Sequence, residues 1–244
     1  MLRDVVRRRR TPPQHDTPTR LEGGRSRCHG ERSRTMTPFW YTLVMKLLLG
    51  TNNKGKVVEI AEVLSGLELD LVTPRHLNIE EPPKESGMSF AQNALQKARY
   101  FYVHSGGIPT VADDSGIIVE ALENELGLHT RRWGAGPTAS DEEWIAYFLK
   151  RMEKESNKRA AFVCTLAHID ARGQIHFFEG RCEGEITPTL EAAYLPGLPI
   201  SACFKPDGSS YVFSALPIEQ KNSTSHRGQA TRKLRQYLEK DTGE

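Results

Sequence analysis

The sequence of 244 residues has few cysteines and no long hydrophobic run. Its four cysteines, Cys28, Cys164, Cys182 and Cys203, form no C-x-x-C pair, so their spacing indicates no zinc site. Three of them lie in apolar, strand-like contexts and are expected to be buried thiols of a reducing, cytoplasmic compartment. The apolar stretch 39–44 is too short to span a bilayer and lacks the small-residue cleavage site of a signal peptide, so we expect no membrane association.

Two common catalytic signatures are also missing. The absence of G-x-x-x-x-G-K-[ST] excludes an ordinary P-loop, and the absence of G-x-S-x-G argues against a serine hydrolase. The net charge is +2, but the first 45 residues contain ten Arg, no Lys and four acidic residues. The remainder carries 23 basic and 27 acidic residues. This mildly acidic body is not typical of a general nucleic-acid binder.

Residues 1–44 are predicted to form a disordered, Arg-rich leader. A block of arginines at residues 7–10 precedes Pro12 and Pro13 and a stretch with few aliphatic residues. Three interpretations are open: a nucleic-acid-binding arm, a targeting peptide, or an upstream extension from a misassigned start, since the body begins naturally at Met45. The acidic residues and the lack of an amphipathic period count against a transit peptide. We therefore expect one domain over residues 45–244.

The body alternates between strand and helix patterns. Apolar runs predict strands at residues 47–49, 69–72 and 109–112, and residues 160–169 and 175–186 predict two long antiparallel strands. Apolar residues at helical spacing predict four helices. These come after the first strand, after Ser89 with Gln92 (a capping-box pattern), after Thr138 with Asp141, and over residues 229–239. This mixture predicts an α/β fold whose sheet is partly antiparallel.

A short polar turn follows the first expected strand. Thr51, Asn52, Asn53, Lys54, Gly55 and Lys56 come directly before the first helical pattern. A strand, a tight turn and a helix start point backbone N–H groups and the positive end of a helix at one place, which suits a phosphate. The lysines and the threonine hydroxyl add donors there. A solvated turn with surface lysines is the alternative.

Two adjacent carboxylates are expected at the end of the third strand. The segment Asp113-Asp114-Ser115-Gly116 follows residues 109–112, and strand ends in α/β folds face the ligand crevice. Adjacent aspartates repel unless one is solvated, capped or bound to a cation, and Mg²⁺ prefers one or two carboxylates with phosphate oxygens and water. An Asx-turn that caps a helix is the alternative.

Other charged residues flank the expected helices. Glu80, Glu81 and Glu85 precede the helix that Ser89 opens, and each could supply a further metal carboxylate or satisfy the helix dipole. Lys97 lies about two turns into this helix, where it could reach a phosphate or be a solvated surface lysine.

Polar residues also open the last helix. Ser225, His226 and Arg227 follow Lys221 and supply a hydroxyl, an imidazole and a guanidinium, which could bind a base or a phosphate. Ser225 and His226 are adjacent in sequence, which places them badly for a proton relay. A serine N-cap with solvated His and Arg is the alternative.

Five ordered segments resemble the noncanonical purine NTP pyrophosphatases, that is, the inosine/xanthosine triphosphatase or XTP/dITP diphosphatase family. They read LLLGTNNKGKVVEI, ESGMSFAQNALQKAR, PTVADDSGIIVEAL, GLHTRRWGAG and EQKNSTSHRGQA, and cover about residues 46–240. The resemblance implies a long mixed sheet flanked by helices, in two lobes with a nucleotide cleft between them. It also implies Mg²⁺, a homodimer, and hydrolysis of ITP, dITP and XTP to the monophosphate and pyrophosphate.

The resemblance assigns roles by position. Asp114 is implied as the catalytic and metal-binding acid, and Glu85 as the second metal carboxylate, with Glu81 as its rival. Substrate contacts are implied for Thr51, Asn52, Asn53, Lys54, Gly55, Lys56, Lys97, Ser115, Lys221, His226 and Arg227. The turn and Lys97 would bind phosphates, while Lys221, His226 and Arg227 would donate to the 6-oxo group of the base. Adenine, with an amino group there, would leave a buried donor unpaired.

One segment departs from the family pattern. Most relatives carry a Gly-Phe-Gly-Tyr-Asp-Pro type loop, whose aromatic residue stacks on the base and whose Asp helps to recognise it. Residues 194–201 read Tyr-Leu-Pro-Gly-Leu-Pro-Ile-Ser here, with Tyr194 as the nearby aromatic residue and no Asp. The departure bears on base selectivity more than on catalysis.

The leading hypothesis is a Mg²⁺-dependent nucleoside-triphosphate pyrophosphatase that clears noncanonical purine nucleotides from the nucleotide pool. A nucleotide-binding protein with weak turnover or a shifted base preference is the alternative, because the base loop is altered. Retention of Asp114 and the phosphate lysines favours the enzyme. The expected partners are a purine nucleoside triphosphate and a second copy of the chain, with no specific nucleic acid.

The leader is expected to be dispensable because its composition cannot build a core. A chain that begins at Met45 should match the full chain in melting temperature and in pyrophosphate release. A large loss of either would show that residues 1–44 pack on the body.

Overall fold

A mixed six-stranded sheet organises the chain. The structure is a computed structural model that describes residues 44–79, 85–123, 125–136 and 138–241, so the leader up to residue 43 and Glu81 lie outside it. The strands are β1 (Met45–Leu49), β2 (Leu69–Val72), β3 (Thr110–Val119), β4 (Arg159–Ile169), β5 (Ile175–Ile186) and β6 (Phe204–Pro206), in the order β2-β1-β3-β4-β5-β6. The first three pair in parallel and the others are antiparallel, which confirms the predicted mixed α/β sheet.

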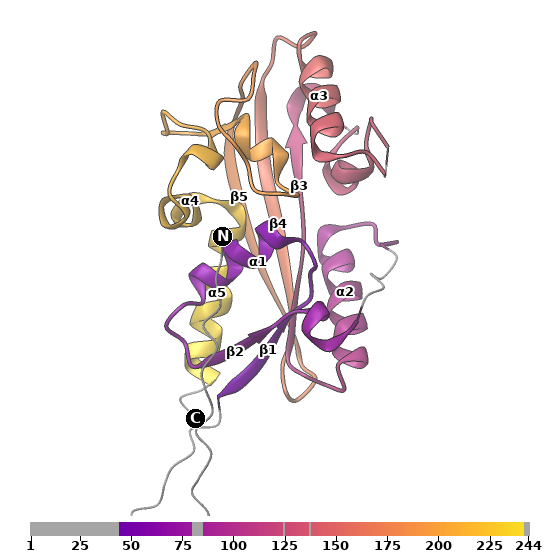
Figure 1. The fold of residues 1–244 in the computed structure, drawn as a ribbon, viewed down its shortest axis with the longest axis vertical. Helices are drawn as coiled ribbons and strands as arrows, with labels where there is room; N and C mark the ends of the chain where they lie inside the picture. Colours follow the sequence, from indigo (N-terminus) through magenta and orange to yellow (C-terminus); the bar gives the residue numbers. More distant parts are fainter. Residues whose placement is uncertain (1–43, 80–84, 124, 137, 242–244) are drawn as a thin grey trace, which may run out of the picture. The chain divides into compact units, whose positions relative to one another are not determined.

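Helices cover both faces of the sheet. They are α1 (Lys54–Val63), α2 (Phe90–His104), α3 (Asp141–Met152), α4 (Ile218–Thr224) and α5 (His226–Asp241). Figure 1 shows α2 on one side of the long strands, α1 and α5 on the other, and α3 beside their far end. No helix among the described residues is long and apolar enough to cross a membrane.

The apolar core is divided between two lobes. In the large lobe, α1 and α5 pack on the sheet through residues that include Leu47, Ile60, Leu166 and Leu234, and α2 packs on the opposite face through Ala94, Ala98, Ala112 and Ala167. In the α3 lobe, a separate cluster contains Trp144, Phe148, Ile117, Phe204 and Phe213. The long strands β3, β4 and β5 contribute residues to both, as the two-lobe expectation requires.

The course of β3 corrects the prediction for this strand. The expected strand ended at residue 112, but β3 continues to Val119 and pairs with β4 over its whole length. Its parallel pairing with β1 is confined to Thr110 and Val111. The pairing of β1 with β3 ends at Leu49, whereas β3 continues to Val119. The Asp113–Gly116 segment of β3 therefore borders the crevice that opens beyond the end of β1. The Asx-turn alternative is therefore wrong.

Helix boundaries follow the capping residues. Ser89 caps α2 as predicted, since its Oγ accepts from the N–H of Gln92 at 3.2 Å. The next helix is capped by Ser140 with Glu143 in a capping box, so the prediction of a start at Thr138 with Asp141 is wrong by two residues. The last helix begins at His226, as the Ser225 motif predicted, and the short α4 before it was not predicted. Cys164, Cys182 and Cys203 are buried free thiols, as expected.

A glycine in β5 sets the place of α5. A Cβ on Gly180 would collide with the carbonyl oxygen of His226, so the first turn of α5 can approach the strand only because residue 180 has no side chain. We expect Gly180→Ala to lower the free energy of unfolding by about 1–3 kcal/mol, measured by urea denaturation. The neighbouring exposed Glu179→Ala should stay within about 0.5 kcal/mol. Equal stability of the two variants would show that α5 can shift freely.

Candidate active site

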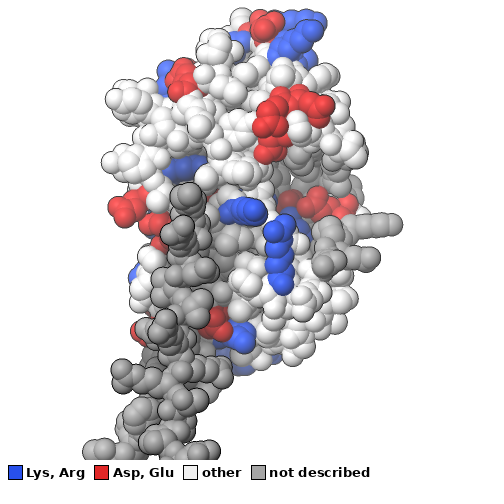
Figure 2. Space-filling model, viewed as in Figure 1, with Lys and Arg blue, Asp and Glu red and all other residues white. Residues whose placement is uncertain are grey.

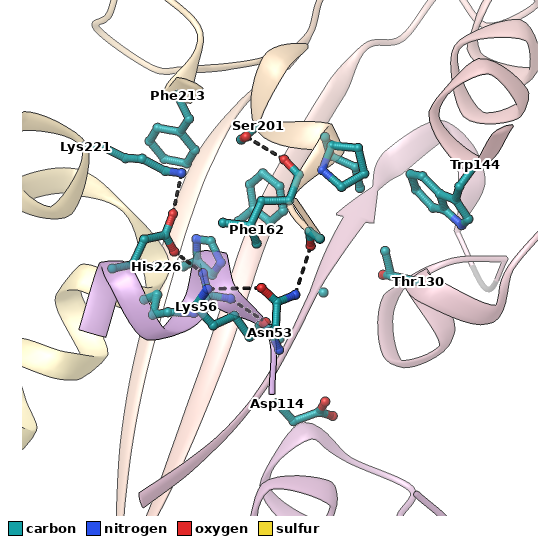
Figure 3. A pocket seen from close by; sticks show the side chains of 18 of the residues that line it. Asn53, Lys56, Asp114, Thr130, Trp144, Phe162, Ser201, Phe213, Lys221 and His226 are labelled. Carbon is teal, nitrogen blue, oxygen red and sulfur yellow. Dashed lines mark hydrogen bonds and ion pairs between the residues drawn. The ribbon is translucent and has the colours of Figure 1, made fainter. Parts of the chain in front are cut away.

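A cavity of about 330 Å³ lies between the two lobes. Among its lining residues are Asn53, Lys56 and Glu59 from α1 and the turn before it, Asp114 and Ser115 from β3, Trp144 from α3, Leu198 to Ser201, and Lys221, His226 and Arg227 from the C-terminal helices. Figure 3 shows Asp114, Asn53 and Lys56 at one end, Lys221 and His226 on one wall, and Trp144 and Thr130 on the opposite wall. The volume suits a small organic ligand.

The turn after β1 reaches the cavity through Asn53 and Lys56. Asn53 is the N-cap of α1, because its Oδ1 accepts from the backbone N–H of Lys56 at 3.1 Å. Its Nδ2 donates to the carbonyl oxygen of Gly197 at 3.2 Å. A Cβ on the buried Gly55 would lie 2.7 Å from Cδ1 of Leu198, so glycine lets residues 194–201 lie against the helix start.

The other turn residues have different surroundings. Thr51 Oγ1 accepts from the N–H of Asn53 at 3.2 Å and so holds the turn together. Asn52 borders a second hollow with Arg75 and Asn78, and Lys54 is exposed. Thr51, Asn52 and Lys54 are not among the described residues that line the central cavity, and their phosphate contacts stay predictions.

Strand alternation separates the two aspartates. Asp113 faces α1 and α5, where its Oδ2 lies 2.9 Å from Lys56 Nζ and 3.4 Å from Arg227 Nη2. Burial alone would raise the pKa of Asp113, but Lys56 and Arg227 outweigh it and hold the pKa well below its usual range. Ser115 lies on the same face, donates to Asp113 at 3.2 Å and accepts from Arg227 at 2.8 Å. Asp113 is therefore the ion-pair partner of two cationic side chains, Lys56 and Arg227.

Asp114 points the other way, toward α2. Lys97 Nζ lies 3.0 Å from Asp114 Oδ1 and 3.1 Å from Glu85 Oε1, and Asn93 Nδ2 donates to Asp114 Oδ2 at 3.0 Å. Burial raises the pKa of Asp114 despite these partners. Burial also opposes the Lys97 charge, but Asp113, Asp114 and Glu85 together raise the pKa of the ammonium. Two carboxylates thus converge on one cation, which brings together the predicted metal ligands Asp114 and Glu85.

A buried charge network forms the wall opposite α3. Glu59 of α1 is 2% exposed and forms ion pairs with both Lys221 and Arg227. Burial would raise the pKa of Glu59, but the two cations lower it. The Arg227 guanidinium binds Glu59, Asp113 and Ser115 at once, so its hydrogen bonds go largely to the protein. Its predicted contact with the base stays a prediction.

His226 belongs to an aromatic surface. Its ring stacks on Phe162 with centroids 4.6 Å apart at 9°, and Phe213 lies at 6.5 Å. Burial, together with Arg227 and Lys221, lowers the pKa of His226 well below its ordinary value, so the imidazole is neutral. Its Nδ1 has no hydrogen-bond partner among the described residues. A buried polar atom without a partner is a contact point for a ligand.

Residues 194–201 contribute to the cavity in an unexpected way. Tyr194 is not among the described residues that line it, and its hydroxyl donates to Glu142 Oε1 at 3.4 Å. The lining comes from Gly197, Leu198, Pro199, Ile200 and Ser201. Phe162, Phe213 and Trp144, which lie on other elements, supply the aromatic surface of the cavity.

Sequence reasoning missed several of these residues. Glu59 and Asn93 occur at polar positions inside apolar helical patterns, a signal that a buried charge or amide was needed there. Phe162, Phe213 and Trp144 carry no local signal, because aromatic residues in strands and helices usually form core. Only the packing of the two lobes brings them to one cavity.

The outer face near the cavity carries both signs of charge. Figure 2 shows acidic side chains over the part of this face where Figure 1 draws α3, and basic side chains lower on the same face. The acidic residues of the first turn of α3 are Asp141, Glu142 and Glu143. This mixed surface differs from the continuous basic surface of a nucleic-acid binder.

Comparisons with known proteins agree with the motif resemblance. A family model described as the Ham1 family matches residues 47–237. A protein named dITP/XTP pyrophosphatase from Leptospira interrogans is 37% identical over 194 residues, which are 79% of this chain and 96% of that protein. A protein of the same name from Aquifex aeolicus is 37% identical over 199 residues, 78% of this chain and 95% of its own.

Solved structures show the same fold. A HAM1 protein from Coxiella burnetii aligns with a TM-score of 0.68 at 29% identity, over 80% of this chain and 99% of its own. The Staphylococcus aureus Ham1 protein aligns with a TM-score of 0.67 at 26% identity over the same shares, 80% and 99%. The predicted family resemblance is confirmed, and this chain belongs to the Ham1 family.

Proposed function

We propose that this protein hydrolyses noncanonical purine nucleoside triphosphates, namely ITP, dITP and XTP, to the monophosphate and pyrophosphate. The observation that carries the proposal is one cavity lined by Lys56, Glu85 and Asp114 and by Lys221 and His226 on a wall. Lys97 forms ion pairs with both of the lining carboxylates, Glu85 and Asp114. Family members named dITP/XTP pyrophosphatase support the substrate class. Release of pyrophosphate from a panel of ITP, XTP, dITP, GTP, ATP and dUTP tests it.

The triphosphate would lie at the end of the cavity beside the α1 N-terminus. Lys56 lines this end and Lys97 is paired with the lining residue Asp114, and each ammonium group is already held by a carboxylate that fixes its position. Phosphoryl transfer depends mainly on positioning and on neutralising the charge of the phosphates. Backbone N–H groups at the helix start and the Ser115 hydroxyl add further contacts.

Asp114 and Glu85 are the residues that would hold Mg²⁺. Their carboxylates fit the ion because both already converge on one cation, the Lys97 ammonium. The described residues contain no cluster of three His, Cys, Asp or Glu side chains, so phosphate oxygens and water would complete the shell, as is usual for Mg²⁺. When bound, the ion would neutralise the polyphosphate. Asp114 would orient the attacking water and accept its proton.

The base would lie between the aromatic residues with its 6-oxo group toward Lys221 and His226. Lys221 keeps hydrogens beyond those that bind Glu59, and neutral His226 offers one N–H. A 6-oxo acceptor satisfies both groups, whereas the amino group of adenine would oppose the donor-only ammonium of Lys221. This wall, rather than the altered 194–201 loop, would determine the choice of base.

The alternative of a nucleotide-binding protein with weak turnover is less well supported. Asp114 keeps a supporting shell of Lys97, Asn93 and Glu85, which binding alone would not need. The proposal also includes a homodimer, which light scattering of the purified protein measures. The buried thiols Cys164, Cys182 and Cys203 support a reducing, cytoplasmic location.

Asp114→Asn should abolish turnover without loss of stability. The change keeps the size of the side chain but removes the carboxylate that activates water, so pyrophosphate release from ITP should fall by at least about 100-fold. The melting temperature should stay close to that of the unchanged protein, because burial already disfavours the Asp114 charge. Activity close to normal at saturating Mg²⁺ would contradict the assignment.

Asp113→Asn is the matched comparison one residue away. Asp113 is a charged partner of Lys56 and Arg227, so its neutralisation takes this carboxylate from Lys56 and leaves Arg227 with Glu59, and it should cost about 3–5 kcal/mol of stability. Urea denaturation of both variants separates the catalytic aspartate from the structural one. The same loss of stability in both would show that strand alternation does not divide their roles.

His226→Phe should weaken base selectivity. The new ring keeps the stacking on Phe162 but lacks the nitrogen donors, so the ratio of kcat/KM for ITP over ATP should fall about ten- to a hundred-fold. Steady-state kinetics with both nucleotides measure this ratio. If both substrates lose activity by the same factor, His226 positions the site and does not read the base.

A further inference from the structure

The 194–201 loop joins the two walls of the cavity through a single residue, Gly197. The N–H of Gly197 donates to Asp141 Oδ2 at 2.5 Å, and the carbonyl oxygen of Gly197 accepts from Asn53 Nδ2 at 3.2 Å. Asp141 begins α3, while Asn53 is the cap of α1. A hydrogen-bonded path therefore runs from the α3 lobe through Gly197 to the turn of the large lobe.

We propose that Asp141 is a positioning residue for the reaction, acting through the backbone of Gly197 on the turn that would bind the phosphates. The proposal rests on the proposed function and gives a role to the loop that departs from the family pattern. Side chains of this loop would not read the base. Its backbone would instead set the place of Asn53, and through it the first turn of α1 and Lys56.

The geometry leaves little freedom at Gly197. Gly197 has a φ of 81°, a conformation that favours glycine, and a Cβ there would collide with the Asn53 amide. Leu198, the next residue, lies against Gly55, where any Cβ would meet its side chain at 2.7 Å. Asn53 is thus fixed from both sides, by Gly197 outside the helix and by the Lys56 N–H inside it.

Small displacements of such a turn have large kinetic effects. A shift of about 1 Å in a substrate-positioning group can cost about 100-fold in rate. Because the turn would contact phosphates, which all nucleoside triphosphates share, its displacement should affect ITP, XTP and ATP by the same factor. A residue that reads the base would instead change the ratio between nucleotides.

The test compares four single variants and one double variant of the full chain with ITP, XTP and ATP. Asp141→Ala removes the acceptor for Gly197, and Asp141→Asn keeps an acceptor oxygen. Glu142→Gln is the matched control, since it removes a neighbouring charge from the same first turn of α3 but keeps an acceptor oxygen for Tyr194 and leaves the Gly197 hydrogen bond intact. Asn53→Ser keeps an N-cap for α1 and removes the donor to Gly197.

We expect Asp141→Ala and Asn53→Ser each to lower kcat/KM about tenfold or more, equally for the three nucleotides. Asp141→Asn should restore most of the activity, and Glu142→Gln should have little effect. The Asp141→Ala/Asn53→Ser double variant should have the same kcat/KM as the less active of the two single variants, because both substitutions break the same hydrogen-bonded path. Multiplied effects in the double variant, or unequal losses among nucleotides, would overturn the proposal.

Hydrogen exchange supplies a readout that does not depend on catalysis. The amides of residues 54–57 should exchange faster in Asp141→Ala than in Glu142→Gln, since only the former releases the cap of α1. Equal exchange in the two variants would overturn the proposal even if Asp141→Ala were inactive. If the unchanged protein hydrolyses none of the nucleotides, the proposed function fails, while the exchange experiment still decides the role of Asp141.

Discussion

Buried charge is the constraint on which the rest of this structure depends. Asp113 and Glu59 lie in the interior with Lys56, Lys221 and Arg227, three cations against two carboxylates. Charges taken out of water are tolerated only when they are paired, so β3, α1 and the two C-terminal helices must meet in one arrangement. The surplus positive charge of this group faces the cavity, which suits a polyanion. The same ion pairs thus hold these elements together and supply the positive charge of the cavity.

The alternation of β3 divides the chemistry of the cavity into two parts. Asp113 faces the cation network and is neutralised by it, while Asp114 faces α2 with Lys97 and Glu85, where carboxylates outnumber the ammonium. A divalent cation would reverse the charge of this second group and make it attractive to phosphate. Two neighbouring residues of one type therefore serve different purposes because successive strand residues point to opposite faces.

The sequence predicted much of the site because its motifs are local. A turn after a strand, a serine before a helix and a carboxylate pair on a strand each have a short-range physical cause, and Asn53, Ser89 and His226 occupy the predicted positions. The length of β3 was not predictable in the same way. Its polar residues look like a turn, and they remain in a strand because β4 offers backbone partners along the whole segment.

The sequence by itself determined the family, the alternation of strands and helices, and the residue types that suit phosphate, metal and an oxo group. Tertiary structure decided which of these residues meet. Glu59 became a partner of Lys221 only because α1 packs beside α4, and Phe162 faces the cavity only because two separately packed lobes leave a space there. The role of the 194–201 loop could likewise not be predicted from its residue types. A backbone amide has no residue type, so its partners depend on where distant segments place their side chains.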